Sequence, residues 1–191
     1  MMVLETAIQG VLVIQPTVFQ DSRGYFLETW SRPRYEQYGI PGTFAQDNVS
    51  SSRKGVLRGL HFQDPNPQGK LVTVLHGSVW DVAVDLRPGS PTFGRWVGHE
   101  LSAENARQVW IPEGFAHGFV VLSDEAVFSY KCTGLYQRDA EHSLRWNDPD
   151  LGIEWPVAQP LLSLKDAEAP LLRELNLRDL RSVSAGAGGR S

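Results

Sequence analysis

Segments that alternate apolar and polar residues recur along the chain, and turn-forming residues separate them. In residues 80–86 (WDVAVDL) every even position is apolar and two of the three odd positions are Asp. This is the period of two expected of a half-buried strand. Similar segments lie at 70–75, 115–122 and 126–133, and turns rich in Gly, Pro, Asp or Ser lie at 21–24, 65–69, 87–91 and 112–114. The pattern predicts a mostly β protein.

Two segments have helical character. A short one near 34–38 ends at Gly39, and a second at 167–180 could place several leucines on one face. Many short strands with a few short helices, one of them towards the C-terminus, are typical of a sandwich, a jelly roll or a closed barrel. The length of 191 residues fits one domain, which we place at 1–181. Residues 182–191 contain mostly Ser, Ala, Gly and Arg and predict a disordered tail.

Composition and charge argue against several classes of protein. Lys and Arg number 18 against 22 Asp and Glu, for a net charge of -4. With no basic run, we expect neither a nucleic-acid partner nor an anionic membrane surface. No export signal and no apolar stretch of the roughly 18 residues that span a bilayer is visible. The single cysteine, Cys132, cannot form an internal disulfide, which favours a reducing, cytoplasmic setting.

The histidines do not have the spacing of a metal site. No pair among the 5 is arranged as HxH or HExxH, so we expect no bound metal. There is also no GxGxxG loop of the kind that a redox enzyme acting on a nucleotide sugar would need for its dinucleotide.

Four residues could carry chemistry, although each also has an ordinary structural explanation. His61 follows Gly59 in a strand segment, where a histidine often bonds to a backbone carbonyl. Tyr130 is expected to point inward from its strand, and Lys70 opens another strand. Asp166 is well placed to cap the last helix. None of the four indicates a function when it is taken alone.

Their neighbours carry a resemblance to a known family. The chain closely resembles the dTDP-4-dehydrorhamnose 3,5-epimerase family in order from about residue 3 to 175. The matching strings are DSRGYFLETW (21–30), QDNVSSS (46–52), VLRGLHFQ (56–63), GSVWDVAVDLRPGSPTFGRW (77–96), IPEGFAHGF (111–119), YKCTGLY (130–136), DPDLGIEWP (148–156) and LSLKDAEAP (162–170).

The resemblance implies a fold and a reaction. It implies a double-stranded β-helix, or cupin jelly roll, that works as a homodimer without metal or organic cofactor. The implied substrate is a dTDP-4-keto-6-deoxyhexose, and the implied reaction converts dTDP-4-dehydro-6-deoxy-D-glucose to dTDP-4-dehydro-L-rhamnose in dTDP-L-rhamnose biosynthesis. Inversion beside a ketone needs a base, an electrophile for the enolate oxygen, and an acid on the opposite face.

The resemblance also implies a role for each matching residue. His61 is the base and Asp166 orients it, Lys70 stabilises the enolate, and Tyr130 is the acid. Tyr136 resembles the residue that stacks on thymine. The remaining matches contact the nucleotide or the sugar, with the two arginines as the natural partners of the diphosphate: Arg23, Glu28, Gln46, Asn48, Arg58, His117, Glu141 and Lys165.

Strand parity raises one difficulty, and other functions stay open. Arg58 and His61 would face opposite sides of an ideal strand, so we expect a bulge at Gly59. A relative that inverts only C3 or only C5 would keep the same base, acid and lysine. A non-catalytic cupin that binds a nucleotide sugar would be expected to lose His61, Asp166 or Tyr130. A metal-dependent cupin enzyme ranks last, because its ligand spacing is missing.

Overall fold

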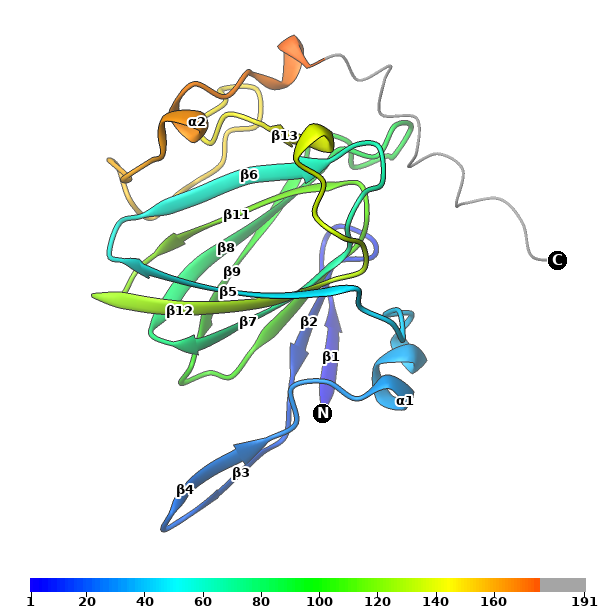
Figure 1. Cartoon of the computed structure of the whole chain (residues 1–191), viewed down its shortest axis with the longest axis vertical. Helices are drawn as coiled ribbons and strands as arrows, with labels where there is room; N and C mark the ends of the chain where they lie inside the picture. Colours follow the sequence, from blue (N-terminus) through cyan, green and yellow to red (C-terminus); the bar gives the residue numbers. More distant parts are fainter. Residues whose placement is uncertain (176–191) are drawn as a thin grey trace, which may run out of the picture.

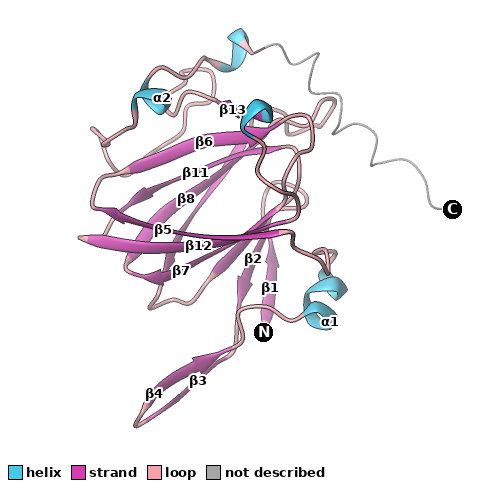
Figure 2. Cartoon of the chain, viewed as in Figure 1, coloured by secondary structure: helices cyan, strands magenta, loops and turns pink. Residues whose placement is uncertain are grey.

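Two antiparallel sheets lie face to face in the computed structural model, which describes residues 1–175 (Figures 1 and 2). The six-stranded sheet has the order β1 (Met2–Glu5), β2 (Leu12–Gln15), β10 (Gln108–Ile111), β7 (Lys70–His76), β12 (Glu125–Cys132) and β5 (Gln46–Arg53). The five-stranded sheet has the order β13 (Glu141–Ser143), β6 (Leu57–Gln63), β11 (Phe115–Val121), β8 (Ser78–Asp85) and β9 (Trp96–Ser102). The expectation of a mostly β protein is confirmed.

The main core fills the space between the two sheets. Phe128 of β12 stacks on Phe119 of β11 with ring centroids 4.1 Å apart, and Phe128 is only 1% exposed. Apolar residues from both sheets join this cluster, among them Val72, Val74, Val79, Ala83, Leu101 and Val109. Burial of these side chains is the dominant favourable term in folding.

The outer face of the five-stranded sheet is covered as well. Trp80, Val82 and Val84 of β8 pack there against Leu144 and Leu151 of the C-terminal segment. The interpretation of residues 80–86 as a half-buried strand is therefore wrong. Its apolar positions face this second core, so its alternate positions, including Asp81, face the interior between the sheets instead of solvent.

The helices are shorter than the sequence pattern suggests. The first, α1 (Arg32–Tyr35), continues into η1 (Glu36–Tyr38) and ends at Gly39 with φ of 77°, as expected. The prediction of one helix over 167–180 is wrong as far as the structure describes this segment. Between residues 164 and 175 there are instead two short helices, α2 (Leu164–Ala167) and η3 (Leu172–Glu174). Pro170 explains the interruption, because it disfavours the helical conformation of the residue before it. A further turn, η2 (Arg138–Ala140), precedes β13. Residues 176–191, which include the predicted tail and the domain boundary, lie outside the described residues.

A two-stranded hairpin projects away from both sheets (Figure 1). It consists of β3 (Val18–Asp21) and β4 (Gly24–Leu27), joined by the expected turn. We call residues 18–27 the arm. Phe19 and Phe26 of the arm are 62% and 68% exposed, although an isolated hairpin is at best marginally stable in water. No helix in the described part of the chain is long and apolar enough to cross a membrane.

Candidate active site

A histidine and a carboxylate form the most specific contact of the site. His61 Nε2 of β6 lies 2.6 Å from Asp166 Oδ1 of α2, and the two side chains are 29% and 5% exposed. Burial alone would raise the pKa of Asp166, but the hydrogen bond and the charge of His61 keep it below its ordinary value. An ionised carboxylate at Nε2 fixes the ring and leaves the lone pair on Nδ1.

The sequence suggested that Asp166 caps the last helix, and this is wrong. Ser163 is the N-cap of α2, and its hydroxyl accepts a hydrogen bond from the backbone N–H of Asp166 at 3.1 Å. The cap fixes the first turn, and Asp166 in that turn is therefore free to direct its carboxylate at His61.

A bulge brings Arg58 and His61 to the same side of β6, as expected. His61 pairs with His117 of β11, whereas Arg58 pairs with Phe119, so β6 has one extra residue in this interval. Gly59 lies there with φ of 133°, and a Cβ at Gly59 would lie 2.4 Å from the Cα of Gly118. Only glycine fits this close approach, and Arg58 and His61 both line one cavity.

Lys70 and Tyr130 come to this cavity from neighbouring strands. Tyr130 of β12 is paired with Val72 of β7, two residues from Lys70. Burial raises the pKa of the Tyr130 phenol, so the hydroxyl keeps its proton and can donate it. Burial lowers the pKa of the Lys70 ammonium. A poorly solvated cation is a strong stabiliser of a nearby oxyanion.

The site is a cleft of two connected compartments. The larger has a volume of about 580 Å³ and the smaller about 230 Å³. The catalytic candidates His61, Lys70 and Tyr130 line both. Most of the other predicted site residues line one compartment each: Arg58, His117, Lys165 and Asp166 line the larger, and Gln46, Asn48 and Tyr136 line the smaller.

Glu141, on the wall shared by the two compartments, organises the rim. It pairs with the ammonium of Lys165 and accepts a hydrogen bond from the Tyr136 hydroxyl at 3.0 Å. The backbone N–H of Tyr136 donates to Gln46 Oε1 at 2.8 Å, and Gln46 Nε2 donates to Asn48. Tyr136 is 50% exposed. A connected set of polar groups therefore holds a half-exposed aromatic side chain at the rim of the cleft.

The sequence interpretation missed one ionisable residue of this site. Asp81 Oδ2 of β8 lies 2.7 Å from His117 Nε2, and the two side chains are 2% and 8% exposed. Burial lowers the pKa of His117 in spite of this carboxylate. A neutral imidazole held by Asp81 therefore forms part of the cleft wall. The available signal was an Asp at a position that alternates with apolar residues in a strand.

Two of the proposed binding residues lie outside the cleft of their own chain. Arg23 lies at the tip of the arm, where its side chain is 88% exposed and pairs with Asp21 at 2.6 Å. Glu28 follows the arm and pairs with Arg34 at 3.4 Å. Neither residue lines either compartment.

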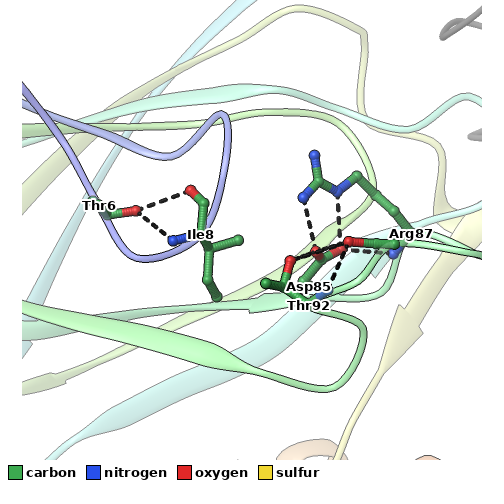
Figure 3. Close-up of polar contacts among 6 residues, drawn as sticks. Thr6, Ile8, Asp85, Arg87 and Thr92 are labelled. Atoms are coloured by element: carbon green, nitrogen blue, oxygen red, sulfur yellow. Dashed lines mark hydrogen bonds and ion pairs between the residues drawn. The ribbon is translucent and has the colours of Figure 1, made fainter.

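A larger cavity, with a volume of about 970 Å³, lies elsewhere, at the loop that contains Thr6 and Ile8. Arg87 on its wall donates two hydrogen bonds to the carboxylate of Asp85, at 2.9 and 2.7 Å (Figure 3). The hydroxyl of Thr92 donates to the same carboxylate at 2.6 Å. The charges of this cluster are thus satisfied internally.

Across residues 1–175, no group of three or more His, Cys, Asp or Glu is arranged to hold a metal ion.

Comparisons with known proteins agree on one family. The model of the dTDP-4-dehydrorhamnose 3,5-epimerase family matches residues 5–174. The enzyme of that name from Salmonella typhimurium is 57% identical over 94% of this chain and 100% of its own. A dTDP-4-dehydrorhamnose 3-epimerase from Streptomyces niveus is 46% identical over 87% of this chain and 82% of its own.

A solved structure gives the same result for the fold. The 3,5-epimerase from Legionella pneumophila in complex with dTDP-4-keto-L-rhamnose is 53% identical, with a TM-score of 0.90 over 92% of this chain and 95% of that one. The expected cupin-type fold is confirmed. The chain belongs to the dTDP-4-dehydrorhamnose 3,5-epimerase family, a family of isomerases that act on nucleotide sugars.

Proposed function

We propose that this enzyme inverts C3 and C5 of dTDP-4-dehydro-6-deoxy-D-glucose and so forms dTDP-4-dehydro-L-rhamnose for dTDP-L-rhamnose biosynthesis. The observation that carries the proposal is the 2.6 Å contact of His61 with Asp166 in a cleft that Lys70 and Tyr130 also line. Named relatives with the 3,5-epimerase activity, such as the 57% identical enzyme from Salmonella typhimurium, support it.

The proposed reaction moves one proton at a time. His61 removes the proton from the carbon alpha to the 4-keto group, and the electron pair moves onto the keto oxygen. The Lys70 ammonium stabilises this enolate, as preorganised charges stabilise oxyanions in dry sites. Tyr130 then donates its phenolic proton to the opposite face of the same carbon. His61 then releases the abstracted proton to solvent and Tyr130 regains one from solvent, so that the same groups can act at the second carbon.

The rim and the cleft walls would bind the nucleotide. We assign thymine stacking to Tyr136, the diphosphate to Arg58, and further contacts with the nucleotide or the sugar to Gln46, Asn48, His117, Glu141 and Lys165. The half-exposed ring of Tyr136 and the exposed side chain of Arg58 suit these roles, because an arginine fork matches phosphate oxygens in two hydrogen bonds.

Isotope exchange tests the reaction and separates it from its nearest alternative. We expect incubation with the dTDP-4-keto substrate in deuterated water to place deuterium at both C3 and C5, read by NMR. A single-site enzyme, such as the named 3-epimerase relative, would give inverted product at one carbon. Inverted product at only one carbon would replace our proposal with this alternative.

A second copy of the chain would complete the site. The exposed aromatic residues of the arm need a cover, since large apolar side chains on a projecting element mark an interaction surface. We propose a homodimer in which each arm crosses to the other copy, so that Arg23 and Glu28 act at the partner's cleft. Light scattering should give the mass of two chains, and a monomer at working concentration would contradict the assignment.

No metal or organic cofactor takes part in the proposed reaction, because Lys70 supplies the electrophile. We expect full activity after treatment with EDTA. Loss of activity that one divalent metal restores would contradict this expectation.

We also propose a cytoplasmic location, because Cys132 is buried, 1% exposed and free.

A further inference from the structure

A buried polar cluster lies at the base of the arm. Thr29 comes two residues after β4, and its carbonyl oxygen accepts a hydrogen bond from Gln108 Nε2 of β10 at 2.8 Å. The hydroxyl of Tyr35 of α1 lies 3.0 Å from the same carbonyl and 2.7 Å from Gln108 Oε1. Gln108 and Tyr35 are 0% and 1% exposed. We call these three residues, together with Thr73, the arm anchor.

The hydrogen-bonding capacity of Gln108 is used by this cluster. One of its two amide hydrogens goes to Thr29 and the other to the hydroxyl of Thr73 at 2.8 Å. Its carbonyl oxygen accepts from Tyr35, whose pKa burial raises to about 12, so the phenol stays a donor. The backbone of Gln108 is paired on both sides, with Ile14 and Thr73. The anchor therefore fastens the chain at Thr29 to a strand that is paired on both sides within the six-stranded sheet.

The anchor is well placed to set the direction of the arm. Residue 23 precedes residue 29 by six positions, which is roughly 20 Å of extended chain. A rotation of about 10° at the base would then move the tip by about 3 Å over that length, which is enough to break a hydrogen bond. The next residue, Trp30, packs edge-on against Phe44 with ring centroids 5.7 Å apart, which adds a second contact at the base of the arm.

We propose that Gln108 and Tyr35 are positioning residues of the epimerase, because they hold the Thr29 carbonyl and so aim Arg23 at the cleft of the second copy. The proposal rests on the proposed function of Arg23. Neither residue lines the cleft, so each acts through the arm and not on the substrate.

A spin label at the tip of the arm tests the anchor directly. Ser22→Cys places the label next to Arg23, and the native Cys132 is buried and does not compete for it. We expect Gln108→Leu to narrow the spectrum of the label, because the arm becomes more mobile. Tyr35→Phe should give a smaller change, since it keeps the bond from Gln108 to Thr29. This milder variant also serves if Gln108→Leu fails to fold.

Thr92→Val is the control for the loss of a side-chain hydrogen bond outside the arm anchor. It removes a 2.6 Å hydrogen bond to Asp85 in the cluster of Figure 3, and Thr92 lines neither compartment of the cleft. We expect its spectrum and its KM to match those of the parent protein. A spectrum that Gln108→Leu and Tyr35→Phe leave unchanged would overturn the proposal.

A double-mutant cycle connects the anchor to the reaction. We expect Gln108→Leu to raise KM about tenfold with little change in kcat, and to add almost nothing to Arg23→Ala, because coupled residues give non-additive effects. Additive effects would show that Gln108 acts elsewhere and would overturn the proposal. If Arg23→Ala alone left KM unchanged, the proposed role of Arg23 would fail, while the spectrum would still decide whether the anchor holds the arm.

Discussion

The cleft and the arm differ in how much of their geometry one chain determines. In the cleft, His61 and Asp166 meet from separate elements at 2.6 Å with side chains 29% and 5% exposed. At the tip of the arm, Arg23 is 88% exposed and pairs with Asp21, only two residues away. An exposed pair of this kind contributes little and opens easily. On our proposal, the chemical step is therefore assembled within one chain, whereas part of substrate binding awaits a second copy.

The largest effect should come from replacing His61, the proposed general base. We expect His61→Asn to lower epimerisation and solvent exchange at both carbons by ~10²- to 10⁴-fold, the usual range for general base catalysis. Deuterium incorporation at C3 and C5 measures both. His76→Asn removes an exposed imidazole from β7 and is the control. Exchange at the parent rate in His61→Asn would show that another group is the base.

Lys70→Met should have the next largest effect. Methionine keeps much of the length of the side chain but cannot stabilise the enolate, so kcat should fall by roughly 10²- to 10³-fold, the cost of losing one oxyanion donor. Binding of dTDP, measured by calorimetry, should stay close to that of the parent enzyme. Lys54→Met, at an exposed lysine outside the cleft, is the matched control. A small loss of kcat would exclude Lys70 as the electrophile.

Tyr130→Phe separates the acid from the base. His61 can still remove a proton and return it to the same face, so exchange should persist at the carbon that reacts first, with retained configuration. Formation of inverted product should fall by about 10²-fold. The packing on Phe128, with ring centroids 6.0 Å apart, is kept. Normal inversion would show that another group is the acid. Loss of both exchange and substrate binding would show that Tyr130 mainly shapes the cleft.

Much of the cleft was predictable because its strands follow local patterns. The segments 70–75, 115–122 and 126–133 were expected as strands and appear as β7, β11 and β12. The bulge at Gly59 followed from strand parity together with the family resemblance, which places Arg58 and His61 in one site although an ideal strand would put them on opposite faces. The strands themselves depend only on the residues of each segment and on general backbone geometry.

Features that depend on distant segments were not predictable in the same way. Alternation in β8 indicated two faces and predicted a half-buried strand, but it did not show that a later segment covers the second face, and Asp81 is in fact only 2% exposed. The local pattern around Asp166 suggested a helix cap, and only the family resemblance implied the contact of its carboxylate with His61, which is 105 residues earlier in the chain. The turn of the arm was expected from DSRG, but these four residues do not predict that the arm projects away from the sheets.

The smallest expected effect belongs to Arg23 of the arm. The same variant can show directly whether the arm of one copy acts at the cleft of the other. Arg23→Ala should raise KM about tenfold, near the lower end for a lost hydrogen bond to a charged group. The His61→Asn chain has no base but an intact arm, and the Arg23→Ala chain has the reverse. If arms cross, a mixed dimer has one cleft with both His61 and a partner's Arg23, so mixing and re-equilibrating the two variants should restore a fraction of sites with the parent KM. Mixtures whose activity is only the sum of the separate variants would place Arg23 at the cleft of its own chain or outside both.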